Sequence, residues 1–400
     1  MKIRDFALAA ALAVQACGGG GSGATASAPV SLPPPPPPPP PPSPPPPPPP
    51  PATCNKAQNL SLAEKPRGVF ASSIPSNADS SSVFRGALVS ANWAEIEPSP
   101  GIFDFTSIDA QLARLPAGAE WSLAVHGGWT SVDETDPDLY DGSTYPDGSP
   151  RPVIALSMSP AWLVTTYHAE TFAMPFRDVT VNMPEYWDPT IQDRLRILAD
   201  GLDQYLLTKR NIRLVYIPQM TSNGLEGHFN GVSQDVLIRA AGIDPTAPDA
   251  ADQFEDIWVD ASLTVSRIFA AKLTDKALAF EVHDVIGRAS IPIRIMDSFL
   301  TDRTFEDRVG VAMWWLSGNT DYQSELTDHL RTYEGDIYGQ IIGRSDQPER
   351  FPNNDFTAVF QQGEDLCIRY IEAWPYEFEN HTYDAEFTDY NTFADSVFDR

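Results

Sequence analysis

The chain has 400 residues, of which 54 are acidic and 27 basic, giving a formal net charge of −27. This charge argues against nucleic acid or an anionic lipid surface as a ligand, because both would be repelled. No phosphate-binding glycine loop, nucleophile elbow or His-Glu-x-x-His helix occurs along the chain, so the sequence favours none of those enzyme classes.

The N-terminal residues are typical of an export signal. Lys2 and Arg4 precede a short apolar run, residues 6–14, which is too short to cross a bilayer as a permanent helix. The segment 14–17 resembles a bacterial lipobox, which implies that Cys17 is lipidated and anchors an outer membrane lipoprotein facing the periplasm or the cell surface. We therefore assign residues 1–17 to a signal peptide with its lipidation cysteine. An ordinary secretory signal with an incidental cysteine is the alternative.

A linker follows the signal, over residues 18–53. Its first part, 18–32, is rich in Gly, Ser, Ala and Thr, and residues 33–51 are proline except for Ser43. Polyproline II rises ~3.1 Å per residue, so the proline segment would reach about 60 Å as a semi-rigid spacer. Recognition by a proline-binding partner is the less favoured interpretation. Residues 54–400 are left as the folded domain.

Short β-like runs recur along the folded domain, with helical patterns between several of them. The clearest helical pattern covers 190–207, and others cover 257–273 and 290–300. This alternation predicts a single α/β domain folded as a (β/α)8 TIM barrel. The eight runs are 68–72, 86–91, 121–126, 213–218, 277–283, 309–315, 336–342 and 367–374.

One segment, residues 84–115, has a distinctive sequence motif. Its pattern W-x-x-I-E-P-x-x-G-x-F-D-F-x-x-I-D resembles the second βα unit of clan A glycoside hydrolases, in particular barrels of the family 42 β-galactosidase type. Segments 159–163 and 184–189 resemble that family's stretches after the third strand and at the start of the fourth helix. The resemblance implies hydrolysis of a poly- or oligosaccharide without a cofactor.

The resemblance also implies two catalytic carboxyl groups. A glutamate after the fourth strand is the acid/base of the clan, and Glu226 follows the fourth run between two glycines. Glycoside hydrolysis requires a second carboxyl group nearby. Glu372, on the last run, is the expected partner. The clan nucleophile lies on the seventh strand, where this chain offers only Gln340.

A different strand count would change these roles. If the first run is not a barrel strand, Glu281 becomes the fourth-strand acid/base and Glu372 the seventh-strand nucleophile. The first count is favoured because Trp93 and the Glu-Pro-Gly sequence after it match the clan's second strand. With Gln340 at the nucleophile position, an inverting hydrolase remains open, and so does a decayed barrel that binds glycans without cleaving them.

Aromatic and polar residues near the ends of the runs are candidates for sugar binding, because aromatic faces stack on pyranose rings. We expect an open cleft lined mainly by tryptophans, with histidines that either bind sugar hydroxyls or fill a polar layer. The candidates are Trp93, His126, Trp129, Trp162, His228, His283, Trp314, Gln340 and Trp374.

Two cysteines remain after Cys17. Cys54 enters the domain before the first run and Cys367 opens the last, and the first and last strands of a closed barrel are neighbours. Both would lie on the N-terminal face, so we predict a disulfide, with two unpaired thiols as the alternative.

Metal binding is not predicted. The acidic residues of 133–141 lack the spacing of an EF-hand, which favours a solvated loop over a calcium site. We expect a monomer that binds a carbohydrate substrate and contacts the membrane only through its lipid anchor.

Overall fold

The computed structural model describes residues 54, 63–146 and 148–398. The predicted signal peptide, Cys17 and the linker therefore lie outside the described residues. Within the described part of the chain, no helix combines the length and the apolar character needed to cross a membrane.

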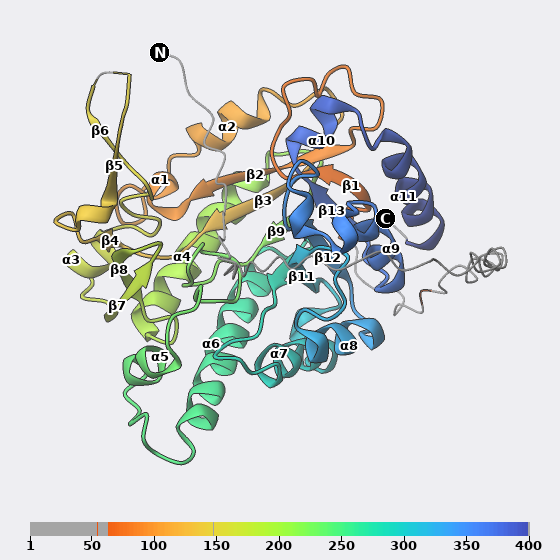
Figure 1. Ribbon diagram of the computed structural model, residues 1–400. Coiled ribbons are helices and arrows are strands. Elements are labelled where there is room, and N and C mark those ends of the chain that lie inside the picture. Colours follow the sequence, from red (N-terminus) through yellow and green to blue (C-terminus); the bar gives the residue numbers. More distant parts are fainter. Residues whose placement is uncertain (1–53, 55–62, 147, 399–400) are drawn as a thin grey trace, which may run out of the picture. The chain divides into compact units, whose positions relative to one another are not determined.

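Eight parallel strands form a closed barrel, which confirms the predicted (β/α)8 fold (Figure 1). The first strand pairs with both the second and the last strand, so the first predicted run is a barrel strand and the alternative strand count is wrong. The strands in chain order are β1 (Gly68–Ala71), β2 (Gly86–Asn92), β3 (Glu120–His126), β9 (Ile212–Tyr216), β10 (Leu278–Glu281), β11 (Val309–Leu316), β12 (Ile337–Ile341) and β13 (Tyr370–Ala373).

Helices cover the outside of the barrel (Figure 1). The longer ones are α4 (Pro189–Leu206), α6 (Ala250–Lys272), α7 (Ser290–Thr301), α8 (Ser324–Thr332), α9 (Ala358–Asp365) and α11 (Asp384–Val397). Shorter ones are α1 (Trp93–Ile96), α2 (Thr106–Leu112), α3 (Trp162–Thr165), α5 (Gln234–Ala240) and α10 (Pro375–Asn380).

The helix α4 shows how local sequence sets an element. Asp188 is its N-cap and accepts a hydrogen bond from the backbone N–H of Thr190, and Pro189 occupies the first turn. Its buried residues recur every three or four positions, which turns one apolar stripe toward the barrel. The predicted helix 190–207 is confirmed to within one residue at each end.

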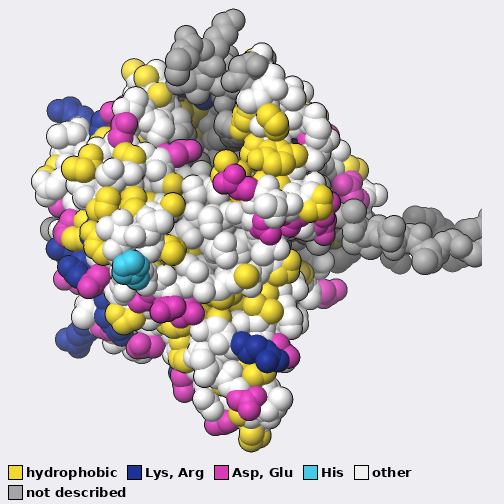
Figure 2. Space-filling view, turned by 90° about the vertical axis from the view of Figure 1, so that its left-hand side faces the viewer, with side chains coloured by type: hydrophobic (Ala, Val, Ile, Leu, Met, Phe, Trp, Pro, Cys, Tyr) yellow, Lys and Arg dark blue, Asp and Glu magenta, His cyan; other side chains and the backbone are white. Residues whose placement is uncertain are grey.

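The long loop after β3 carries small antiparallel elements, β4 (Ser131–Val132), β7 (Thr171–Phe176) and β8 (Val179–Pro184), and a separate hairpin of β5 (Tyr140–Thr144) and β6 (Pro150–Pro152). Its acidic side chains close local turns: Asp133 accepts from the N–H and hydroxyl of Thr135, and Asp141 accepts from the N–H of Ser143. On the face drawn in Figure 2, acidic side chains are scattered among uncharged and hydrophobic ones.

Two apolar layers hold the barrel together. One lies between strands and helices, and the other fills the barrel interior, because alternate residues of each strand point inward. The interior layer consists of Phe70, Leu88, Ala124, Leu214, Tyr216, Leu225, Ala277, Ala279, Ala312, Trp314, Tyr338 and Tyr370.

Cys54 and Cys367 form the predicted disulfide, with an S–S distance of 2.04 Å and a Cα–Cα distance of 5.6 Å. It joins the start of the folded domain to the residues just before β13. The first and last strands, β1 and β13, pair with each other, as a closed barrel requires.

The motif that follows β2 forms a buried junction. Glu97 has no exposed surface and accepts hydrogen bonds from Trp93 Nε1 (2.7 Å), the Gly101 N–H (2.8 Å) and Arg194 Nη2 (2.9 Å). The Glu97 carbonyl oxygen accepts a further hydrogen bond from Trp162 Nε1. These contacts tie the end of β2 to α3 and α4, so the motif serves the structure of the barrel.

Candidate functional site

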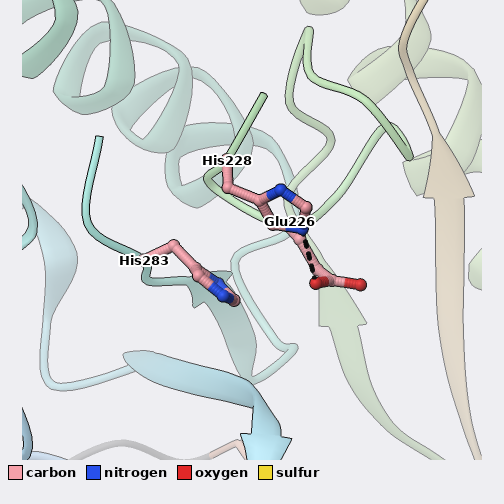
Figure 3. Close-up of side chains that lie close together, drawn as sticks. All are labelled: Glu226, His228 and His283. Atoms are coloured by element: carbon pink, nitrogen blue, oxygen red, sulfur yellow. Dashed lines mark hydrogen bonds and ion pairs between the residues drawn. The ribbon is translucent and has the colours of Figure 1, made fainter. Parts of the chain in front are cut away.

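The candidate site lies at the carboxyl ends of β9 and β10, where (β/α)8 enzymes build their active sites. Glu226 and His228 come from the loop after β9, and His283 follows β10 by two residues. Figure 3 shows the three side chains turned toward one another. One carboxylate oxygen and one nitrogen of each imidazole all lie within 4.8 Å of one another.

Glu226 is held in place by its neighbours. The Asn223 side chain donates to Glu226 Oε1 and accepts from the Glu226 N–H, and His228 Nε2 lies 2.9 Å from Glu226 Oε2. The Asn230 N–H donates to His228 Nδ1 at 3.0 Å, so the neutral ring carries its proton on Nε2 and donates it to Glu226. Side chains of Glu226 and His228 are 22% and 23% exposed, so solvent reaches both.

Glu281 lies beneath this group and is only 1% exposed. It accepts hydrogen bonds from the Gly227 N–H (2.7 Å) and the Trp314 N–H (3.2 Å), which connects the loop after β9 to β11. His283 Nδ1 lies 2.9 Å from Glu281 Oε1. An ionised carboxylate only accepts hydrogen bonds, so His283 donates from Nδ1 and keeps Nε2 free.

The pKa values of Glu226 and Glu281 are shifted in opposite directions. Burial raises the pKa of Glu281, and the charge of Glu226 adds to the increase while His283 opposes it. Burial also acts to raise the pKa of Glu226, but the hydrogen bond and charge of His228, together with His283, hold it below its ordinary value. Burial acts to lower the pKa of His283, but Glu281 overcomes this and raises it. Neighbouring groups with such opposed shifts are typical of acid–base sites.

His126 supports the same loop from β3. Its Nδ1 lies 2.9 Å from the carbonyl oxygen of Asn223, and burial lowers the pKa of its imidazole. The structure thus brings together five of the predicted site residues, Glu226, Glu281, His126, His228 and His283.

Glu372 is placed differently from the expectation. It points into the barrel interior, where Oε1 accepts from the hydroxyls of Tyr216 (2.8 Å) and Tyr370 (2.7 Å), and Oε2 accepts from Gln340 Nε2 (2.7 Å). It has no exposed surface. Gln340, the other predicted residue there, serves as a hydrogen-bond donor to Glu372.

Burial raises the pKa of Glu372 to about 7, against the hydrogen bonds from Tyr370, Gln340 and Tyr216. A carboxyl pKa that is higher in the folded state favours the fold at low pH, and this stability is lost as pH rises through about 7. We expect the loss between the ordinary pKa of 4.5 and pH values above 7 to be about 3 kcal/mol relative to Glu372→Gln. Urea unfolding of both proteins across this range measures it, and parallel pH profiles would contradict the assignment.

Most of the predicted tryptophans belong to the core. Trp93, Trp129 and Trp162 are buried, and their indole N–H groups donate to Glu97 Oε2, the Ala155 carbonyl and the Glu97 carbonyl respectively. Trp314 fills the barrel interior against Tyr216, with ring centroids 5.2 Å apart. This corrects the expectation of a cleft lined by their open faces. Trp374 is partly buried and donates to the Ile341 carbonyl.

Tyr322 is a site residue that the sequence did not indicate. It lies in the loop after β11, is 45% exposed, and has its ring centroid 5.6 Å from that of Trp315. Burial raises the pKa of its hydroxyl, and the charges of Glu226 and Glu281 add to the increase. Trp315 in turn has its ring centroid 5.9 Å from that of His283. No motif marks it, because only the folding of the sixth strand's loop brings it to the site.

Solved structures with a similar arrangement include glycoside hydrolases. An endo-glycoceramidase II from Rhodococcus sp., solved as a lactosyl-enzyme intermediate, shares 11% identity over 79% of this chain and 75% of its own, with a TM-score of 0.40. A GH5-4 broad specificity endoglucanase from Clostridium acetobutylicum shares 10% identity over 73% of this chain and 76% of its own, with a TM-score of 0.37. A β-galactosidase from Marinomonas ef1 shares 11% identity over 76% of this chain and 53% of its own, with a TM-score of 0.42.

No protein-family model matches the chain, and no curated protein matches it in sequence. The fold is established by the strand pairing of the closed barrel, and the function has to be argued from the side chains at its mouth.

Proposed function

We propose that the protein hydrolyses a glycosidic bond in a poly- or oligosaccharide at the C-terminal mouth of the barrel. The observation that supports this best is the pair of carboxyl groups, Glu226 and Glu281, next to the same imidazole of His283. Glycoside hydrolysis requires two acid–base groups that flank the scissile bond. In this proposal His283, oriented by the buried Glu281, takes the place of Glu372 as the second acid–base group.

The proposal divides the reaction between Glu226 and His283. Glu226, which solvent reaches, accepts a proton from the attacking water. The protonated form of His283, which Glu281 favours by raising the pKa of the imidazole, is oriented through Nδ1 and donates a proton from Nε2 to the leaving oxygen. The water oxygen bonds to the anomeric carbon as the glycosidic C–O bond breaks, and the proton on Glu226 later returns to the imidazole. Tyr322 offers an exposed ring, packed against Trp315 next to His283, on which a sugar ring could stack.

Binding of a glycan without cleavage is the second candidate. Gln340 favours this candidate. It lies on β12, the strand where clan A enzymes carry their nucleophile, and its amide donates a hydrogen bond to Glu372. An amide cannot attack the anomeric carbon as a carboxylate does.

Incubation of the full chain with a panel of oligo- and polysaccharides distinguishes the two candidates. Hydrolysis predicts new reducing ends from at least one glycan. Binding alone predicts a calorimetric signal without new reducing ends. If no glycan is bound or cut, both candidates are wrong.

We also propose export and lipid anchoring through Cys17. A disulfide between Cys54 and Cys367 supports export, because such bonds persist in oxidising compartments. Cell fractionation tests this: the native chain should lie in the membrane fraction, and Cys17→Ala should release it to the soluble fraction. A native chain found soluble would contradict the anchor.

A further inference from the structure

We propose that Glu226, His228 and His283 bind a divalent transition metal ion, for which Zn²⁺ is the best match. Two imidazoles and one carboxylate, with one donor atom each within 4.8 Å of the others, form a three-ligand set that leaves a position open. Imidazole nitrogen suits zinc, whereas calcium and magnesium prefer oxygen ligands alone. Within the described residues, these three are the one group of such donors that lies close enough together.

Two of the three ligands, His283 and Glu226, have the supporting contacts that metal sites need. A metal-bound histidine donates its second ring N–H to a carboxylate or carbonyl, which fixes the ring and leaves the other nitrogen for the metal. His283 meets this condition, because its Nδ1 lies 2.9 Å from Glu281 Oε1. Glu226 is likewise held by the amide of Asn223, which donates to its Oε1.

The loop that carries two of the ligands is anchored before any ion arrives. The Gly227 N–H donates to Glu281 Oε2 at 2.7 Å, so the residue between Glu226 and His228 is tied to β10. The imidazoles of His228 and His283 have centroids 4.7 Å apart. Since Glu226 and His228 are partly exposed, an ion can reach the group from solvent.

Zinc binding changes one contact of His228. Its Nδ1 now accepts from the Asn230 N–H, so Nε2 carries the ring proton. Coordination through Nε2 moves that proton to Nδ1 and breaks the bond to Asn230. One neutral hydrogen bond contributes far less than zinc–imidazole coordination, so the exchange favours the metal. An ion held by Glu226 and by His283 Nε2 would also block the acid–base roles proposed for both groups, so the zinc-bound protein would not cleave a glycan by that route.

The test uses full-length protein treated with a chelator, desalted and titrated with ZnCl₂ in a calorimeter, without any substrate. We expect one zinc ion per chain at this site, and Co²⁺ should give the absorption of a bound ion. His228→Ala and Glu226→Gln should each weaken binding by about 100-fold or more, and Glu281→Gln by roughly tenfold through His283.

His329→Ala is the matched control, because this partly exposed histidine pairs with Asp297 on α7, outside the ligand set. Circular dichroism shows whether each variant is folded. Wild-type protein that takes up no zinc would overturn the proposal. So would zinc binding that His228→Ala and Glu226→Gln leave unchanged. Either result leaves glycan hydrolysis to be judged separately by release of reducing ends.

Discussion

Glu226→Gln is expected to lower kcat/KM on a cleaved glycan by about 10²- to 10⁴-fold, because an amide cannot accept the proton of the attacking water. The substitution keeps the shape of the side chain. The Glu226 N–H can still donate to Asn223 Oδ1, and His228 can still donate to the remaining carbonyl oxygen. The fold should therefore be preserved, and the loss should appear mainly in kcat.

Release of reducing ends under saturating and limiting substrate measures both constants. Glu306→Gln is the matched control, because this glutamate is 67% exposed and follows the short helical turn Arg303–Phe305, away from the ends of β9 and β10. It should retain the wild-type rate. Full activity in Glu226→Gln would remove Glu226 from the mechanism and with it the proposed pair.

Glu97→Ala is expected to lower the free energy of unfolding by roughly 3–5 kcal/mol. The substitution leaves three donors without their acceptor, namely Trp93 Nε1, the Gly101 N–H and the Arg194 guanidinium. Arg194 is only 12% exposed, so its charge would remain largely buried without its carboxylate. A buried unpaired charge is among the costliest defects that a single substitution creates.

Urea unfolding with the disulfide intact measures the effect. Glu95→Ala is the control, because Glu95 lies on the same short helix α1 but is exposed, and its loss should change stability by no more than about 0.5 kcal/mol. Equal stabilities of the two variants would contradict the view that the motif after β2 is a structural junction.

The motif after β2 predicted the local structure correctly but did not reveal the role of its side chains. Trp93 and Glu97 carried the resemblance to glycoside hydrolase barrels, and the strand and helix around them form as the pattern predicts. Their side chains nevertheless satisfy each other inside the protein. Sequence shows that a tryptophan ends a strand, but the packing of α3 and α4 decides whether its face meets solvent.

The two candidate glutamates that lie on strands, Glu281 and Glu372, also differ in a way that only the structure reveals. Glu281 and Glu372 both lie on buried barrel strands, where alternate residues point inward. Glu372 pairs in register with Phe70 and Gln340, and it is enclosed by tyrosines within the barrel. Glu281 ends its strand beside the loop that carries Glu226. The stagger of the closed barrel sets this depth, and no single strand contains that information.

The sequence by itself determined the eight strands, the main helices and the disulfide, because each depends on local periodicity or on the neighbourhood that barrel closure requires. It also placed Glu226 after the fourth strand. Only the tertiary structure joined Glu226 and His228 to His283, which lies 55 residues beyond His228 on the neighbouring strand's loop. Ligands and catalytic groups drawn from two loops have no fixed spacing, so their meeting depends on the pairing of β9 with β10.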